Sequence, residues 1–277
     1  MADNINPGNG LGATAYWTAA VRAQESVRGD RLFSDPYAAA LAGAAGAEWI
    51  AQRPPDSTTP IVLRTRYFDD FLQRVTAQHS VRQVVLMAAG LDTRAFRLPW
   101  PDQTQIWELD QPDVLAYKER VLQAAGARPT CARRAIETDL TMSWTESLLS
   151  AGFDTSHPSC WLLEGFLFYL PNSATTDILN RVSRLAAPGS WLGMDVVNGA
   201  TLTSPYTKPW IDMQARQGAP WLGTMDDPVA FLAERGWTAT LSQPGQPDAN
   251  HGRWKLPVIP TTMPAMPHNW YVTAQKV

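Results

Sequence analysis

Short apolar runs alternate with amphipathic segments from about residue 80 to the end of the chain. The runs are rich in β-branched and aromatic residues, which is typical of strands buried on both faces of a parallel sheet. The segments between them carry apolar residues at helical spacing, so the pattern predicts a doubly wound α/β sheet. Seven strands are predicted, the last two as a hairpin-like pair, at residues 83–88, 105–109, 133–137, 160–163, 191–196, 237–241 and 270–274.

The same pattern predicts two groups of helices. Three of them precede the first strand, at residues 14–26, 36–50 and 61–78, and should cover a face of the sheet or its ligand cleft. The others connect the strands, near residue 95 and at 111–124, 144–151, 174–185 and 228–235.

The domain organisation follows from this order of elements. Residues 198–226 are rich in Gly, Pro, Thr and Trp and are interpreted as an inserted lid. We expect an N-terminal helical cover at residues 1–80 and a core at residues 81–277 that carries this lid. The two parts should pack as one unit.

The turn after the first predicted strand is the most informative local feature. The apolar run ends there in Ala88, Ala89 and Gly90, and glycine suits a turn that needs a positive φ or a close backbone approach to a ligand. The next run ends 20 residues later in Asp110, where nucleotide-binding α/β folds place an acid that accepts from ribose hydroxyls. The Gly-x-Gly-x-x-Gly pattern of a pyrophosphate cradle is absent, which favours an adenosine without a pyrophosphate.

Two sequence blocks, Ala88 to Arg94 and Glu108 to Pro112, resemble a known family. This is the leucine carboxyl methyltransferase-like family of S-adenosyl-L-methionine (SAM)-dependent O-methyltransferases, which includes the tetracenomycin-type polyketide enzymes. Further matching blocks span residues 22–37, 64–70, 139–140, 162–170 and 270–274.

The resemblance implies both a fold and a cofactor. The fold would be a Rossmann-like class I methyltransferase, with a seven-stranded, mostly parallel sheet, helices on both faces, an N-terminal helical cover and an inserted lid. SAM would be the cofactor and S-adenosyl-L-homocysteine (SAH) the product. A cytoplasmic O-methyltransferase of secondary metabolism is the expected type of protein.

Methyl transfer needs no metal and no covalent enzyme intermediate, so the candidate residues are those that hold cofactor and acceptor. Asp110 is expected to bind the ribose and Gly90 to leave room for the methionyl part, with a capping aspartate and a plain turn glycine as alternatives. Asp139 would accept from the adenine amine while Leu140 covers the ring, unless Asp139 caps the helix before Trp144.

Two further candidates follow the fourth predicted strand. In the resembling family, the glutamate that matches Glu164 contacts the cofactor, and a buried Glu needs a cationic partner in any case. Tyr169 is a candidate for the acceptor pocket, with core packing as the alternative. Asp92 and Arg94 either bind the cofactor or form an ion pair that staples the loop.

Arginine suits the carboxylate of the cofactor because its planar fork binds two oxygens and is always charged. Arg64 and Arg66 are the leading candidates, with Arg22 third. Residues two apart do not share a helix face, so only one of the first pair can reach the cleft. We prefer Arg64 and expect Arg66 to pair with Asp69 or Asp70.

The sequence indicates the methyl acceptor less clearly than it indicates the cofactor. The histidines, at positions 79, 157, 251 and 268, share no metal-ligand spacing and lie outside the matching blocks. A phenol usually needs a base at neutral pH, whereas a carboxylate is already ionised. The sequence therefore favours a carboxylate of a small molecule or peptide.

Two other functions stay open. One is methylation of a phenolic or enolic hydroxyl of a polyketide-like metabolite, for which His251 is a candidate base; the other is a SAM-binding protein without turnover. Five tryptophans gather in the last quarter of the chain and either pack in the core or wall an aromatic pocket. They are at positions 210, 221, 237, 254 and 270.

The composition limits the classes of molecule that the protein is expected to bind and the compartment in which it is expected to occur. The net charge is −3 and the pI about 5.8, so no basic surface predicts binding to nucleic acid or to an anionic membrane. The two cysteines lie far apart, as free thiols in a reducing cytosol would. No apolar run approaches the length of a membrane span, which is consistent with a cytoplasmic protein. The sequence gives no indication of the oligomeric state.

Overall fold

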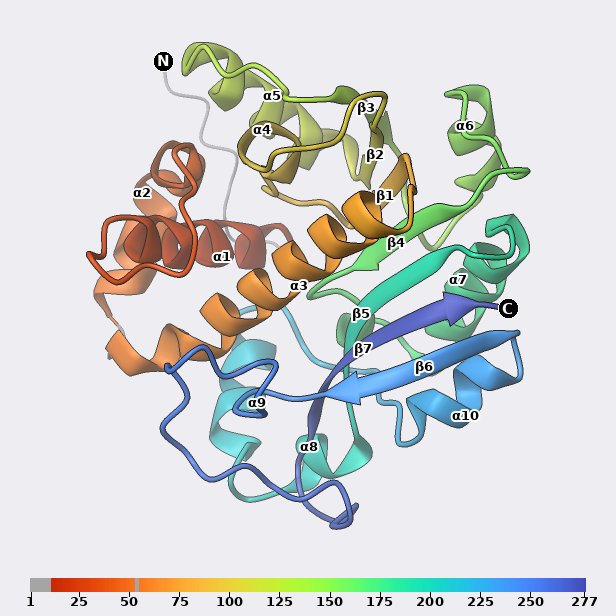
Figure 1. The fold of residues 1–277 in the computed structure, drawn as a ribbon. Coiled ribbons are helices and arrows are strands. Elements are labelled where there is room, and N and C mark those ends of the chain that lie inside the picture. The colour runs from red at the N-terminus through yellow and green to blue at the C-terminus, as the bar shows by residue number, and fades with distance from the viewer. Residues whose placement is uncertain (1–10, 53–54) are drawn as a thin grey trace.

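A computed structural model describes residues 11–52 and 55–277, and its centre is a seven-stranded sheet (Figure 1). Each predicted strand is present, with ends that differ by at most two residues from the prediction. The strands are β1 (Gln83–Met87), β2 (Gln105–Asp110), β3 (Ala132–Glu137), β4 (Ser159–Leu163), β5 (Trp191–Val197), β6 (Trp237–Ser242) and β7 (Asn269–Lys276).

The strand order is β3-β2-β1-β4-β5-β7-β6. Strands β1 to β5 pair in parallel, and β7 is antiparallel to both β5 and β6, so the predicted final pair is confirmed. The connections change direction between β1 and β4. In open α/β sheets, ligands bind at the carboxyl ends of the strands next to such a switch point.

Helices cover both faces of the sheet, as predicted. They are α1 (Leu11–Ser26), α2 (Ala38–Ala51), α3 (Thr59–Gln78), α4 (Arg94–Arg97), α5 (Pro112–Ala124), α6 (Thr145–Ser150), α7 (Asn172–Leu185), α8 (Gly199–Thr203), α9 (Lys208–Arg216) and α10 (Pro228–Ala233). Two short 3-10 turns, η1 (Pro55–Thr58) and η2 (Leu167–Tyr169), complete the described elements.

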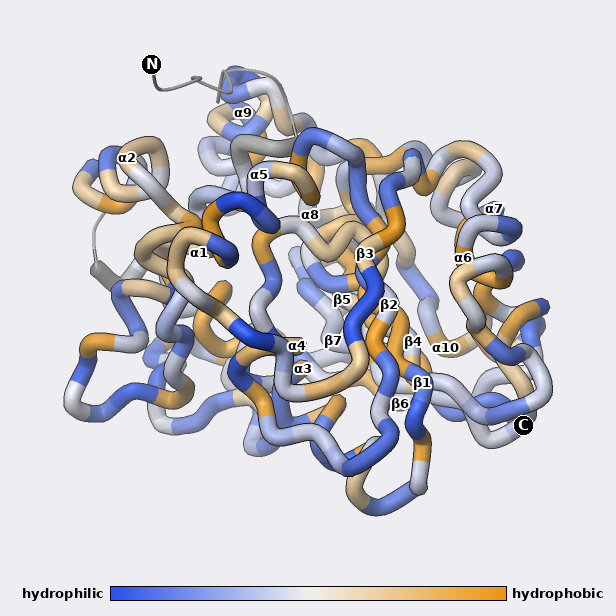
Figure 2. The backbone as a smooth tube through the Cα atoms, turned by 90° about the horizontal axis from the view of Figure 1, so that it is seen from above, coloured by the Kyte–Doolittle hydropathy of each residue, from blue (hydrophilic) through white to orange (hydrophobic). Residues whose placement is uncertain are grey.

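Strand β1 shows how the two faces are built. Its residues alternate between them: Val84 and Leu86 pack with α1 to α5 in one buried cluster, and Val85 and Met87 pack with α6, α7 and α10 in another. All five residues of the strand are buried, as the continuous apolar run predicts. Hydrophobic residues accordingly concentrate along the central strands (Figure 2).

The N-terminal helices differ in detail from the prediction. Helix α2 begins two residues later than expected and is kinked at Gly43, where φ is +56°. Helices α1 and α2 lie so close that a Cβ on Gly46 would be 2.7 Å from the carbonyl oxygen of Tyr16. Within the described part of the chain, no helix is both long and apolar enough to cross a membrane.

The predicted lid, residues 198–226, contains two helices that its composition did not indicate. The Asn198 side chain caps α8 by accepting from the N–H of Thr201, and Pro209 stands in the first turn of α9. Proline is compatible with that position because the first N–H groups of a helix have no partner within it. The interpretation of this segment from its composition therefore missed α9.

Candidate functional site

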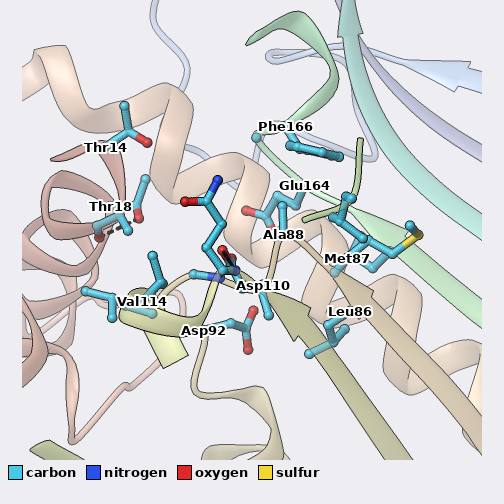
Figure 3. Close-up of a pocket in the computed structure, with 18 of the residues that line it drawn as sticks. Thr14, Thr18, Leu86, Met87, Ala88, Asp92, Asp110, Val114, Glu164 and Phe166 are labelled. Carbon is cyan, nitrogen blue, oxygen red and sulfur yellow. Dashed lines mark hydrogen bonds between the residues drawn. The ribbon is translucent and has the colours of Figure 1, made fainter. Parts of the chain in front are cut away.

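A cavity opens at the carboxyl ends of β1, β2 and β4, and α1 covers it from the other side (Figure 3). Glu164, Asp110 and Asp92 reach it from the ends of the strands, while Thr14 and Thr18 face it from α1. The residues predicted to bind cofactor or acceptor all line this cavity: Arg22, Arg64, Gly90, Asp110, Asp139, Leu140, Glu164 and Tyr169. The structure thus brings together residues from six separate segments of the chain.

The turn after β1 is held by Asp110. Gly90 has a φ of +48°, and its N–H donates to Asp110 Oδ2 at 2.6 Å. The N–H of Gln111 donates to Asp110 Oδ1 at 2.7 Å. Ala88, which is not a glycine, also has a positive φ of +51°, an arrangement that costs free energy and is often found at functional sites.

The environment of Asp110 decides its charge. Burial raises the pKa of the carboxyl group above its usual value, and the N–H groups of Gly90 and Gln111 oppose the increase. A carboxylate has about four acceptor positions, and the protein fills two of them. Asp110 therefore retains acceptor positions for a ligand in the cavity.

Asp139 lies at the end of β3 and does not cap a helix. Its Oδ1 accepts from the N–H of Thr141 at 2.8 Å and from the Thr141 hydroxyl at 2.7 Å, while α6 begins only at Thr145. The alternative in which Asp139 caps the helix before Trp144 is therefore wrong. Leu140 beside it is buried and offers an apolar surface to the cavity.

Arg64 joins two carboxylates at the ends of β4 and β5. Its Nε donates to Glu164 Oε1 and its Nη1 to Asp195 Oδ2, both at 3.0 Å. Burial acts to lower the pKa of the guanidinium, but Asp195 and Glu164 outweigh it and hold the pKa above its usual value. Asp195 also accepts from the N–H of Gly165 at 2.6 Å, so it fixes both Arg64 and the turn after Glu164.

Arg94 forms a second buried ion cluster beside the first. It contacts Asp92 at 2.5 Å, which is the predicted ion pair, and Asp69 at 2.6 Å. It also lies 2.7 Å from Glu164 Oε2, so Glu164 has two cationic partners, as its burial required. Burial acts to raise the pKa of Asp92, but Arg94 and the more distant cations Lys118 and Arg97 lower it to about 2.

The other two candidate arginines have different partners. Arg22 donates to Asp35 Oδ2 at 2.8 Å and to the carbonyl oxygen of Leu91 at 2.6 Å, which ties α1 to the loop after β1. Arg66 donates to both oxygens of Asp70 at 2.9 Å and does not line the cavity. The prediction that Arg66 pairs with a neighbouring aspartate is confirmed.

Tyr169 borders the cavity at η2, next to Trp221 of the lid. The rings of Tyr169 and Trp221 meet edge to face, with centroids 6.4 Å apart. Burial raises the pKa of the Tyr169 hydroxyl, while Arg64, Trp221 and Thr14 oppose the increase. The hydroxyl therefore stays protonated at neutral pH.

No histidine is among the described residues that line the cavity. His79 packs on Trp191, His157 pairs with Asp154, and His268 stacks on Trp270. His251, the candidate base for a hydroxyl acceptor, lies 4.0 Å from Asp70 on α3.

Sequence reasoning missed some residues and left others undecided. Asp195 was missed, although a lone acid in the apolar run of β5 was a usable signal. Asp69 was expected only as a surface partner, but it is buried and binds both Arg94 and Arg97. Of the five clustered tryptophans, Trp237 and Trp270 belong to the hydrophobic core, and Trp221 packs beside Tyr169.

Comparisons with known proteins agree with this geometry. A family model described as leucine carboxyl methyltransferase matches residues 15–183. A protein of Streptomyces coelicolor, classed among SAM-dependent methyltransferases, is 40% identical over 267 residues, which cover 90% of this chain and 88% of the relative. A relative from Mycolicibacterium gilvum with the same description is 41% identical over 277 residues, which cover 91% and 90% of the two chains.

Solved structures support the fold. A Thermobifida fusca protein classed as a methyltransferase superposes with a TM-score of 0.63 at 15% identity, covering 99% of this chain and 97% of that one. Magnesium protoporphyrin IX methyltransferase from Synechocystis, solved with SAH bound, gives a TM-score of 0.54 at 11% identity, covering 84% and 95%. The chain has the Rossmann-like class I fold, belongs to the leucine carboxyl methyltransferase family and is a SAM-dependent methyltransferase.

Proposed function

We propose that the protein methylates a carboxylate oxygen of a small molecule or peptide. The observation that carries the proposal is that, among the described residues that line the cavity, each possible base is either paired with an arginine or, like Asp110 and Asp139, assigned to the cofactor. There is no histidine, Glu164 and Asp92 are held by arginines, and the Tyr169 hydroxyl has a raised pKa. A carboxylate is ionised at neutral pH and needs no base, whereas a phenol does.

The residues around the cavity fit SAM. Asp110 has acceptor positions left for the ribose hydroxyls, and Gly90 leaves the space beside them open. Asp139 and Leu140 offer an acceptor and an apolar surface to the adenine. We assign the methionyl ammonium group to Glu164.

Arg64 is the proposed ligand of the methionyl carboxylate. Two of its five N–H groups are used by Glu164 and Asp195, which leaves donors for a further anion. We rank Arg22 below Arg64 because Arg22 donates to Asp35 and to the carbonyl oxygen of Leu91. Fixing Arg64 from two sides also reduces the entropy lost when it binds a ligand.

The protein contributes to the reaction by positioning the acceptor oxygen and by excluding water from the cavity. When bound, SAM supplies an activated methyl group, so the chain need only hold the acceptor oxygen in line with it and exclude water. Helix α1 closes one side of the cavity with Thr14, Ala15 and Thr18. The ion clusters around Arg64 and Arg94 keep the strand ends rigid.

A substrate panel with SAM tests the proposal. Acids (benzoate, phenylacetate, hexanoate and an N-acetylated leucyl peptide) and phenols are compared by the release of SAH. We expect turnover of acids, with a rate at saturation that stays flat from about pH 6 to about pH 9, because a carboxylate is fully ionised there. Replacing His79, His157 or His251 by Gln should change that rate by less than a few-fold.

The same panel separates the alternatives. Turnover of phenols only, with a rate that rises with pH, would replace the carboxylate by a hydroxyl acceptor. Loss of a hundredfold or more in one of the histidine variants, with SAM affinity intact, would have the same consequence.

A further inference from the structure

We propose that the acceptor is an acid with an apolar body and a single carboxylate, rather than a diacid or a peptide. This inference rests on the proposed function, since it names the class of acid that would fit the same site. It follows from three uncharged residues that line the cavity beyond Glu164, namely Phe166, Tyr169 and Leu170. These three residues are called the η2 wall below.

The order of the strands gives the cavity a direction. The ends of β3, β2, β1 and β4 lie next to one another in this order, and they lead into Asp139, Asp110, Gly90 and Glu164. The adenine, ribose and methionyl groups assigned to these residues would occupy the cavity from β3 to β4. The η2 wall lies beyond β4, and in Figure 3 Phe166 is on the far side of Glu164 from Asp110. The body of the acceptor therefore has to extend along this wall.

The backbone of η2 sets which side chains form the wall. The N–H of Tyr169 donates to the carbonyl oxygen of Phe166 at 3.0 Å, and residues three apart in a 3-10 turn lie on the same side. Leu167 and Phe168, between them, are buried and do not line the cavity. Phe166 and Leu170 are 7% and 6% exposed, so each packs mostly in the core and offers the rest of its surface to the cavity.

The lid holds η2 in place from behind. The N–H groups of Leu222 and Gly223 both donate to the carbonyl oxygen of Phe168, at 2.7 and 3.1 Å. A Cβ on Gly223 would be 2.8 Å from the carbonyl oxygen of Leu167, so this close approach of two backbones requires glycine. The Trp221 ring packs on the Phe168 ring with centroids 4.3 Å apart. A wall that is fixed before the ligand binds loses little entropy on binding.

No cation among the described residues that line the cavity is left free for a second acidic group. The arginines there are all paired with carboxylates; they are Arg22, Arg64, Arg94 and Arg97. The donors that Arg64 has left are assigned to the methionyl carboxylate. A second carboxylate on the acceptor would therefore lie against the η2 wall without a partner, which is unfavourable. A peptide would bring amide groups to the wall, where the Tyr169 hydroxyl is the one polar side-chain group.

A panel of acids tests the proposal on the wild-type enzyme. Butanoate, hexanoate and octanoate differ only in the length of the apolar body, and adipate carries a second carboxylate in place of the terminal methyl group of hexanoate. With SAH release as the readout, kcat/KM should rise about threefold for each added CH2 group. The kcat/KM for adipate should be about 100-fold below that for hexanoate. Equal values for adipate and hexanoate, or a higher value for the N-acetylated leucyl peptide than for octanoate, would overturn the proposal.

Leu170→Ala tests the wall itself, because it removes apolar surface and no polar group. The loss of kcat/KM should grow with chain length, from less than about twofold for butanoate to about 10-fold for octanoate. The wall contacts the body of the acid and not the reacting atoms, so the loss should be an increase in KM with kcat nearly unchanged. SAM affinity should stay within about twofold of wild type.

Two more variants complete this test. Phe166→Leu should give the same trend with chain length, and it replaces Leu170→Ala if that protein does not fold. Leu222→Ala is the matched control, because this leucine is 52% exposed and does not line the cavity, although its N–H binds η2. The control should keep the wild-type kcat/KM for every acid. A wild-type dependence on chain length in the folded wall variants would refute the role of the wall.

Calorimetry with SAH-saturated protein gives a readout that does not depend on turnover. Burial of apolar surface makes the heat-capacity change of binding negative. This change should be more negative for octanoate than for butanoate, and Leu170→Ala should reduce the difference. Equal heat-capacity changes for the two acids would overturn the proposal.

The two kinds of experiment separate this inference from the proposed function. Octanoate that binds with the expected heat-capacity change but is not methylated would retain the apolar site and refute carboxylate methylation. Acids that are methylated with no preference for an apolar body would leave the proposed function standing and refute this inference.

Discussion

Replacing Asp110 by Ala should weaken SAM binding without preventing folding. The carboxylate is mostly buried, accepts from the N–H groups of Gly90 and Gln111, and has two acceptor positions left for the ribose hydroxyls. A hydrogen bond to a charged group contributes about 1.5–3 kcal/mol. Its loss corresponds to an increase in Kd of about 10- to 150-fold.

The variant also affects the free protein, which has to be measured separately. The Gly90 N–H would lose its acceptor, and an unsatisfied buried donor costs about 1–3 kcal/mol of unfolding free energy. Calorimetric titration with SAM should therefore be accompanied by denaturant unfolding of both proteins. Asp113→Ala is the matched control, since this exposed acid is three residues away and does not line the cavity.

The pH dependence of SAM affinity gives an independent check of the role of Asp110. Because burial raises the pKa of Asp110, protonation removes its acceptor capacity at a higher pH than for an ordinary aspartate. Wild-type affinity for SAM should fall as the pH is lowered from about 7.5 to about 4.5, and part of this fall should be absent in Asp110→Ala. A folded Asp110→Ala protein with wild-type SAM affinity would refute the ribose assignment.

Two further substitutions test the turn and the ion cluster. Gly90→Val should abolish measurable SAM binding and lower the free energy of unfolding by about 1–3 kcal/mol. A β-branched residue is strained at φ +48°, and its side chain would protrude towards Ala15. Unchanged turnover in this variant would contradict the assignment of Gly90. Asp92 has a pKa of about 2, below the ordinary 3.8, so it contributes stability above pH 4 that is lost as the pH falls towards 2. The difference in unfolding free energy between wild type and Asp92→Asn should therefore shrink by about 2 kcal/mol over that range, and a constant difference would contradict it.

The strands of the sheet could be predicted because continuous apolar runs are strong signals that involve only neighbouring residues. A continuous apolar run can be buried on both faces only in the centre of a parallel sheet, and each run that ends in an acid places that acid at the carboxyl edge. Asp110, Asp139 and Glu164 were found in this way, and all three line the cavity. Their positions depend on topology alone.

The partners of these acids were not predictable in the same way. Arg64 and Asp195 are 131 positions apart, and neither periodicity nor spacing pairs two such residues. Asp35 shows the same limit. Its carboxylate accepts locally from the N–H of Tyr37, just before α2, and also from Arg22 and Thr93, which lie far away along the chain. A buried carboxylate has enough acceptor positions for local and distant partners together, and spacing along the chain indicates only the local ones.

The pairing of charges explains which groups are left for the ligand. Around the cavity the arginines bind Asp35, Asp69, Asp92, Glu164 and Asp195, whereas no ion pair joins Asp110 or Asp139 to a cation within the described part of the chain. The unpaired acids leave a local excess of negative charge, which favours a sulfonium cofactor over a dinucleotide and its pyrophosphate. The same excess disfavours an anionic acceptor at the strand ends. The proposed acid therefore has to bind away from the strand ends, on the side of the cavity that Tyr169 of η2 borders.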